Sequence, residues 1–172
     1  MAEELVDLVD DNDGVVGAAS IRDCLEGGLL HRAVAVVVVR SDGRIILQQR
    51  SRSDRWQPGL WTLSSTGHVR SREAYEAAAA RELEEELGIQ TPLSRLGKYL
   101  LPPITAGGLT EREWVTLFAG RSDSPLTIDP VELEGTETVG QARARAMMGQ
   151  GLVTPDASFL LEEYFRLQAH VV

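Results

Sequence analysis

The sequence has a single cysteine and no long apolar segment. Cys24 alone excludes an internal disulfide bond, so a reducing cytoplasm is the expected location. The longest apolar runs, such as residues 33–39, are too short to span a bilayer, and no membrane partner is expected. The first residues are acidic, with no basic segment followed by an apolar one, which predicts no secretory signal.

Positive charge is also scarce. Lys and Arg number 17 against 26 Asp and Glu, giving a formal net charge of −9 at pH 7. A field of this sign disfavours binding to duplex nucleic acid. The excess of acidic residues either keeps the protein soluble or is partly concentrated at one place to bind metal, and the two interpretations are compatible. One short segment of this acidic chain is locally basic, because it carries three arginines: Arg50, Arg52 and Arg55.

The chain fits one domain over residues 1–172, because it shows no repeats, low-complexity tracts or obvious linkers. The order of strands, helix, strands and helices predicts an α/β (α+β) fold, a mixed sheet with helices on its faces. Turn signals and apolar patterns predict an N-terminal hairpin (4–28) and C-terminal helices (141–149 and 156–169, within 141–169). Further strands are predicted at 32–40, 44–50, 61–68, 93–101, 112–119 and 136–139, and helices at 20–27 and 72–87.

One of these helices carries an unusual set of carboxylates. A helix turns about 100° per residue, so Glu82, Glu85 and Glu86 share one face. Ala80 and Leu83 occupy the neighbouring arc and are expected to face the core. Like charges repel, and the macrodipole disfavours anions near a helix C-terminus. A solvated acidic helix is one interpretation; Mg²⁺ or Mn²⁺ held by the carboxylates is the other.

The spacing of the whole segment 67–89 resembles the Nudix box. That box is a glycine, five residues, a glutamate, seven residues, then Arg-Glu-aliphatic-any-Glu-Glu-any-Gly-aliphatic. Every fixed position is filled here, by Gly67, Glu73, Arg81, Glu82, Leu83, Glu85, Glu86, Gly88 and Ile89. With average residue usage, a chance match in a chain of this length is roughly one in a million or rarer.

The resemblance implies a Nudix-type α/β/α sandwich with a mixed β-sheet, and it also implies residue roles. Arg81 would orient a glutamate by a charge-assisted hydrogen bond, and Glu73 would brace the loop against the helix. Glu82 or Glu85 would also help to activate water, which makes them and Arg81 catalytic candidates. The implied ligands of Mg²⁺ or Mn²⁺ are Glu82, Glu85, Glu86 and the carbonyl of Gly67.

The activity that the box implies is hydrolysis of a diphosphate bond by metal-activated water. The expected partner is therefore a small molecule of the nucleoside-diphosphate type. A nucleotide sensor without catalysis is a weaker alternative, because binding alone would tolerate loss of the glutamates. A homodimer stays open, since members of the family are often dimers.

Outside the box, residues 28–120 resemble the isopentenyl diphosphate isomerase branch of the superfamily. The cues are the segments 30–33, 58–62, 67–68 and 108–113. The resemblance implies a second metal site at His31, His68, Glu111 and Glu113. Glu111 and Glu113 are two residues apart, so on a strand they face the same side and suit ligands or a general base, unless they are exposed edge charges. We predict Glu111 and His68 as metal ligands, Glu113 as catalytic and His31 as substrate-binding.

Two departures from the isomerase pattern favour hydrolysis. The isomerases carry a cysteine just before the glycine of this segment, where this chain has Thr66, and a hydroxyl poorly replaces a thiol that exchanges a proton with carbon. Cys24 stands where a further histidine ligand is expected. The isomerases also usually carry a degraded box, and this one is complete. We therefore predict a hydrolase, with an isomerase-like enzyme acting on a prenyl diphosphate as the alternative.

Substrate contacts are predicted at Arg50 and Arg55, which match diphosphate-binding places of the isomerase branch. Both are otherwise ordinary surface arginines. Trp61 is predicted to flank the substrate, although tryptophans more often belong to the core. Trp114 should face away from the glutamate pair, because it directly follows Glu113.

Overall fold

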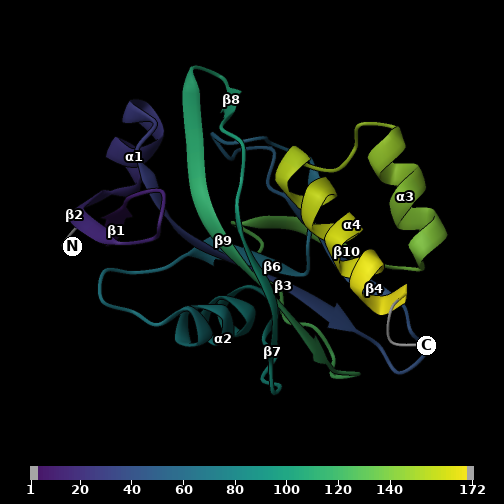
Figure 1. Ribbon diagram of the computed structural model, residues 1–172. Helices are drawn as coiled ribbons and strands as arrows, with labels where there is room; N and C mark the ends of the chain where they lie inside the picture. Colours follow the sequence, from purple (N-terminus) through teal and green to yellow (C-terminus); the bar gives the residue numbers. More distant parts are fainter. Residues whose placement is uncertain (1–3, 170–172) are drawn as a thin grey trace.

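In the computed structural model, which describes residues 4–169, one mixed β-sheet lies between two helical layers (Figure 1). The helices are α1 (Ile21–Gly27), α2 (Tyr75–Leu87), α3 (Gln141–Gly149) and α4 (Pro155–Ala169). The strands are β1 (Leu5–Val9), β2 (Val15–Ser20), β3 (Leu30–Val39), β4 (Ile45–Arg50), β5 (Trp61–Thr62), β6 (Ser65–His68), β7 (Ser94–Leu100), β8 (Ile104–Ala106), β9 (Leu109–Arg121) and β10 (Leu133–Val139). Helix α2 covers one face and helices α3 and α4 the other, which confirms the predicted α/β/α sandwich.

Strand β3 is the centre of the sheet. It pairs in parallel with β9 and antiparallel with β6, β4 and β1. Its alternate residues enter two cores: Val34, Val36 and Val38 pack toward α2, whereas Ala35 and Val37 pack toward α3 and α4. Burial on both faces explains why this strand is a nearly continuous apolar run and does not alternate with polar residues.

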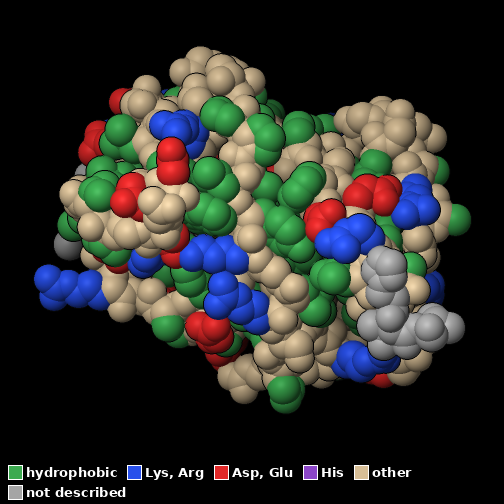
Figure 2. Space-filling model, in the orientation of Figure 1, with side chains coloured by type: hydrophobic (Ala, Val, Ile, Leu, Met, Phe, Trp, Pro, Cys, Tyr) green, Lys and Arg blue, Asp and Glu red, His purple; other side chains and the backbone are tan. Residues whose placement is uncertain are grey.

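Charge is mixed on the one face of the molecule that Figure 2 shows. On the face shown in Figure 2, acidic and basic side chains lie next to one another and do not form a large patch of one sign. Within residues 4–169, no helix is long and apolar enough to cross a membrane.

Helix α2 begins three residues later than predicted. Arg72 has a φ of +67° and Ala74 is extended at φ −79° and ψ 148°, so neither continues a helix. The preceding loop is held to β1 instead, since the Ser71 amide donates to the Leu5 carbonyl at 2.7 Å. The prediction that Ala80 faces the core is wrong: it is exposed, and Ala79 occupies the buried position one turn before Leu83.

The single strand predicted at 61–68 is two short strands, β5 and β6, which pair with β4 and β3 respectively. The other remaining elements match the predictions to within a few residues, with two exceptions. The short strand β8 was not predicted, and β9 begins at Leu109, not at residue 112. Both differences have one cause, because β8 and the start of β9 form a hairpin across Gly107 and Gly108, which both adopt positive φ. The extension matters for the site, since it places Glu111 inside a strand.

Candidate functional site

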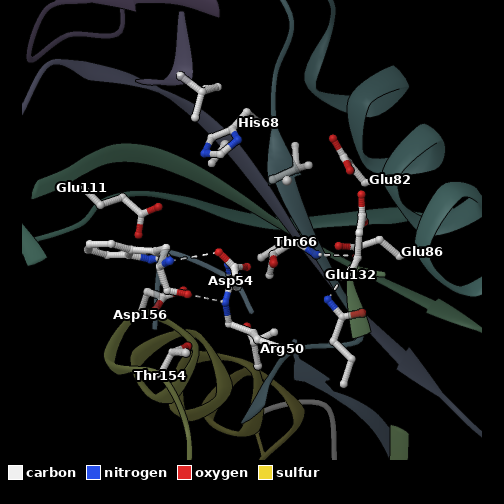
Figure 3. Close-up of a pocket in the computed structure, with 18 of the residues that line it drawn as sticks. Arg50, Asp54, Thr66, His68, Glu82, Glu86, Glu111, Glu132, Thr154 and Asp156 are labelled. Carbon is white, nitrogen blue, oxygen red and sulfur yellow. Dashed lines mark hydrogen bonds and ion pairs between the residues drawn. The ribbon is translucent and has the colours of Figure 1, made fainter. Parts of the chain in front are cut away.

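A cavity of about 830 Å³ opens between the α2–β6 unit, strand β9 and the amino end of α4. Figure 3 shows Glu82 and Glu86 on one side of this cavity and Glu111, Thr154 and Asp156 on the other. The predicted site residues that line it are Arg50, Gly67, His68, Arg81, Glu82, Glu85, Glu86, Glu111 and Glu113. Segments far apart in the sequence are thus brought to one place.

The three box glutamates differ in their surroundings. Glu86 is only 7% exposed, and burial raises its pKa to about 8. Its Oε2 accepts hydrogen bonds from Gln48 Nε2 and the Thr66 amide, both at 3.2 Å. Burial also raises the pKa of Glu82, whereas the Glu85 side chain is 51% exposed. Carboxylates that are disfavoured as free anions fit a divalent cation, which suits Glu82 and Glu86 to hold one. Glu85 lies beside them on the same helix face and can complete the set.

Gly67 lies directly against Glu82. A side chain at position 67 would overlap the Glu82 carboxylate, and the φ of Gly67 is not in the left-handed region. The glycine is therefore required by close approach and not by backbone conformation. This contact brings the end of β6 next to a box carboxylate, as expected if both contribute to one cation site.

Arg81 connects the loop, the helix and the cavity. Its guanidinium donates to both carboxylate oxygens of Glu73, at 2.9 and 2.8 Å, and to Glu82 Oε1 at 2.6 Å. It also donates to the His68 carbonyl at 3.1 Å. The bidentate pair fixes the guanidinium plane, so Arg81 can orient Glu82. This geometry is the one that the predicted roles of Arg81 and Glu73 require.

Replacing Glu73 with glutamine is expected to destabilise the fold by about 1–3 kcal/mol at pH 7. Hydrogen bonds from Arg81 lower the pKa of Glu73 below 4.5, so its contribution is present above that pH and is lost as pH falls through the lowered value. Urea unfolding at pH 7 and below pH ~4 measures this. The exposed Glu76→Gln is the matched control, and equal losses in both variants would refute the bracing role.

A second cluster joins His31, His68 and Glu113. The β3–β9 register sets His31 opposite Glu113, and the β3–β6 register sets His68 opposite Ala33. Nε2 of each histidine lies 3.4 Å from the same oxygen, Glu113 Oε1. His31 Nδ1 lies 2.9 Å from the Leu29 carbonyl, which leaves its Nε2 facing the cluster.

These three residues offer ligand atoms that all lie within 4.8 Å of one another, a spacing that suits a metal ion. His31 does not line the cavity; it lies fully buried behind it. Burial would raise the pKa of Glu113, but the charge interactions with the two neighbouring histidines lower it. The cluster therefore holds a carboxylate in its ionised form, as a metal ligand needs.

Glu111 points into the same cavity as Glu113, as their spacing predicted. Burial and the neighbouring Glu113 raise the pKa of Glu111 well above its usual value. Trp114 faces away, with its indole N–H donating to the Asp10 carbonyl at 3.2 Å.

Not every predicted residue reaches the cavity. Arg55 is exposed and Trp61 packs against the core beneath α3 and α4, so neither lines it. Arg50 does, but it already donates to the Trp56 carbonyl at 3.0 Å and to Asp54 at 2.5 Å. Residues that were not predicted also line the cavity, among them Gln48, Glu132, Thr154 and Asp156.

The sandwich fold and the strand–loop–helix unit with its glutamates define the protein class. A family model described as the NUDIX domain matches residues 29–156. The chain belongs to the Nudix family, as predicted.

Within that family, several similar curated proteins are isomerases by name. The chain is 36% identical over 146 residues to isopentenyl-diphosphate Delta-isomerase 2 of Photorhabdus laumondii, which covers 85% of this chain and 82% of that protein. It is 38% identical over 141 residues to the isopentenyl-diphosphate Delta-isomerase of Streptomyces coelicolor, covering 80% and 72%. The predicted likeness to the isomerase branch is confirmed.

Solved structures share the fold. A crystal structure of a Deinococcus radiodurans protein matches 92% of this chain and 98% of its own, with a TM-score of 0.79 and 25% identity. The Ap4A hydrolase of C. elegans matches 81% of this chain and 98% of its own, with a TM-score of 0.61 and 21% identity, which shows the fold alone. The Nudix domain supports an enzyme that uses a divalent metal. The names of the relatives suggest an isomerase and not the predicted pyrophosphohydrolase.

Proposed function

We propose that this chain is a divalent-metal-dependent enzyme that binds a small molecule through its diphosphate group and hydrolyses it. The observation that carries the proposal is that Glu82, Glu85 and Glu86, the complete acidic set of the box, line one cavity together with Thr66. The metal binding and the diphosphate are common to both candidate reactions. The reaction itself depends on which residues surround the substrate.

Different residues of the cavity would have different roles in hydrolysis. Glu82, Glu85, Glu86 and the Gly67 carbonyl would hold the cation, which when bound neutralises phosphate oxygens and lowers the pKa of a water molecule. Arg81 orients Glu82 from behind, through the hydrogen bond at 2.6 Å. Glu113 on β9 faces the same cavity, and its ionised carboxylate is suited to orient a water molecule by accepting a hydrogen bond.

Isomerisation of a prenyl diphosphate is the second candidate, and the comparisons favour it over hydrolysis. Relatives named isopentenyl-diphosphate Delta-isomerase cover most of the chain at 33–38% identity. His31, His68 and Glu113 are also three of the four residues that this branch implies as metal ligands, and their ligand atoms lie within 4.8 Å of one another. The observation against it is Thr66, which lines the cavity where the isomerases carry a cysteine, because a hydroxyl is far less able to exchange a proton with carbon.

One experiment separates the two reactions. The protein is incubated with Mg²⁺ and, separately, nucleoside di- and triphosphates, sugar nucleotides, dinucleoside polyphosphates and isopentenyl diphosphate. Hydrolysis releases phosphate or yields two smaller products, which mass spectrometry detects. Isomerisation preserves the mass of the substrate and moves its double bond, which NMR detects. We expect phosphate-bond cleavage of at least one nucleotide-type substrate and no isomerisation. Isomerisation by the wild type would overturn hydrolysis in favour of the second candidate.

Thr66→Cys is the matched gain-of-function test. If the frame of the site is isomerase-like and only the thiol is lacking, the variant should convert isopentenyl diphosphate at a rate at least about tenfold above wild type. Thr66→Ser, which keeps a hydroxyl, is the control and should not. Equal rates in all three proteins would show that Thr66 does not determine the reaction.

A further inference from the structure

Gln48 is a polar side chain in a buried row of the sheet. Side chains alternate along β4, so Gln48 shares its face with Ile46, which packs in the core beneath α2. Gln48 is only 1% exposed, and it lines the cavity beside the glutamates of that helix. A buried amide is costly unless its N–H groups and its oxygen find partners, so the contacts of Gln48 indicate what it does.

One end of the Gln48 amide holds Glu86 in place. Gln48 Nε2 donates to Glu86 Oε2 at 3.2 Å, and the Thr66 amide donates to the same oxygen at 3.2 Å. Thr66 and Glu86 lie next to each other in Figure 3. The two donors come from different strands, β4 and β6, so the carboxylate is fixed from two directions. Both hydrogen bonds go to Oε2, which leaves Oε1 as the oxygen for a cation.

The other end of the Gln48 amide lacks a partner in the described part of the chain. Gln48 Oε1 is buried, and no donor among residues 4–169 bonds to it. Turning the amide over does not supply one, because it would set Gln48 Oε1 against the ionised Glu86 carboxylate, and two acceptors do not bond. Native proteins pair nearly all buried polar atoms, so this oxygen indicates a donor that enters through the cavity.

A water molecule that coordinates a cation is a donor of the required kind. Mg²⁺ keeps several waters when carboxylates bind it, and the hydrogens of those waters point away from the ion. A cation held by Glu86 brings such waters to the part of the cavity that Gln48 lines. The phosphate groups of a substrate are mainly acceptors and do not supply the donor.

We infer that Gln48 is a positioning residue, which orients Glu86 through its N–H group and a water of the bound cation through its oxygen. Partners of this kind, one step behind the ligands, orient a metal site. The inference rests on the proposed function, because it requires a cation at the box glutamates. The next residue, Gln49, donates to the Gly59 carbonyl at 2.9 Å and does not line the cavity, so it has no part in this arrangement.

The test measures how tightly Mn²⁺ binds to the substrate-free protein, from the electron paramagnetic resonance signal of the free ion. Glu86→Gln identifies the binding step that belongs to the box glutamates. Gln48→Met keeps the length of the side chain and removes both polar ends, so Mn²⁺ should bind at this step about 10- to 100-fold more weakly than in the wild type. At saturating Mn²⁺, kcat should fall by about tenfold or more with a smaller change in KM, because Gln48 acts through Glu86 and not on the substrate.

Gln49→Met is the matched control, since it changes the same residue type one position along β4 and should leave the Mn²⁺ affinity unchanged. Gln48→Asn keeps the amide on a side chain too short to reach Glu86. It should also weaken Mn²⁺ binding, and it carries the test if Gln48→Met does not fold. An unchanged Mn²⁺ affinity in the Gln48 variants, where Glu86→Gln weakens it, would overturn the inference alone. If Glu86→Gln binds Mn²⁺ like the wild type, the proposed function fails and the inference fails with it.

Discussion

Glu86→Gln should stabilise the metal-free protein and at the same time remove most of its turnover. Glu86 is only 7% exposed, and its pKa is raised to about 8 by burial. An acid whose pKa is raised on folding weakens the fold as pH rises from its unfolded value of about 4.5 toward the folded one. Glutamine keeps the shape and cannot ionise, so the variant should gain about 2–4 kcal/mol at pH 8 and nothing near pH 4.

With Mg²⁺ bound, the wild type should become more stable than the Glu86→Gln variant. A bound cation stabilises the ionised Glu86 in the wild type, whereas the variant has lost a ligand and should respond weakly. Turnover should fall by about 100- to 1,000-fold, the size of effect expected when one electrostatic contact to the reacting group is removed. Urea unfolding at pH 5 and pH 8, with chelator and with Mg²⁺, measures the stability, and initial rates measure the turnover.

Glu84→Gln is the matched control, because Glu84 is exposed on the same helix and does not line the cavity. It should change neither the response to Mg²⁺ nor the rate. If Glu86→Gln were instead the less stable protein at pH 8 without metal, the hydrogen bonds from Gln48 and the Thr66 amide would be what holds this carboxylate. The case for a cation at Glu86 would then fail.

The regular elements were predictable because their periodicity reflects burial. The valines of β3 form an unbroken apolar run since both faces of that strand are covered, and Leu83 and Leu87 mark the buried stripe of α2. The stripe continues to Ala79, four residues before Leu83, and not to Ala80. Residues 77–80 of that helix are all alanine, so the sequence alone does not fix which of them faces inward.

The site was predictable where its residues are close in the sequence. The box residues lie within one strand–loop–helix unit, so their spacing alone encodes their geometry. His31, His68 and Glu113 meet only because β3 pairs with both β6 and β9, a register that no local pattern contains. They were predicted through the resemblance alone, and their roles remain predictions.

Thr154 and Asp156 were overlooked for a related reason. Together with Pro155 they give an ordinary helix-start signal, which predicted α4 and gave no indication of a cavity. Arg55 and Trp61 show the opposite error. Their residue types suit a phosphate and an aromatic contact, but Arg55 is exposed on a loop and Trp61 packs against the core. Side-chain direction in a loop depends on tertiary contacts that the sequence does not display.

The second large effect is expected for Gly67→Ala. The added methyl group would overlap the Glu82 carboxylate, while the backbone of Gly67 is in a region open to alanine. The strain therefore falls on Glu82, which must turn away from β6 and from its hydrogen bond with Arg81. We expect a loss of about 1–3 kcal/mol in stability, typical of overpacking, and a fall in turnover of about 100-fold.

Gly135→Ala is the control for this change, because Gly135 has neither a positive φ nor any atom within 4 Å of an added side chain. The double variant Gly67→Ala/Glu82→Ala should recover much of the stability and none of the turnover, since it removes the overlap together with the carboxylate. Stability from urea unfolding and initial rates separate the two effects. If Gly67→Ala behaved like Gly135→Ala in both measurements, Glu82 would not be held against β6, and the carbonyl at position 67 could not share a cation with it.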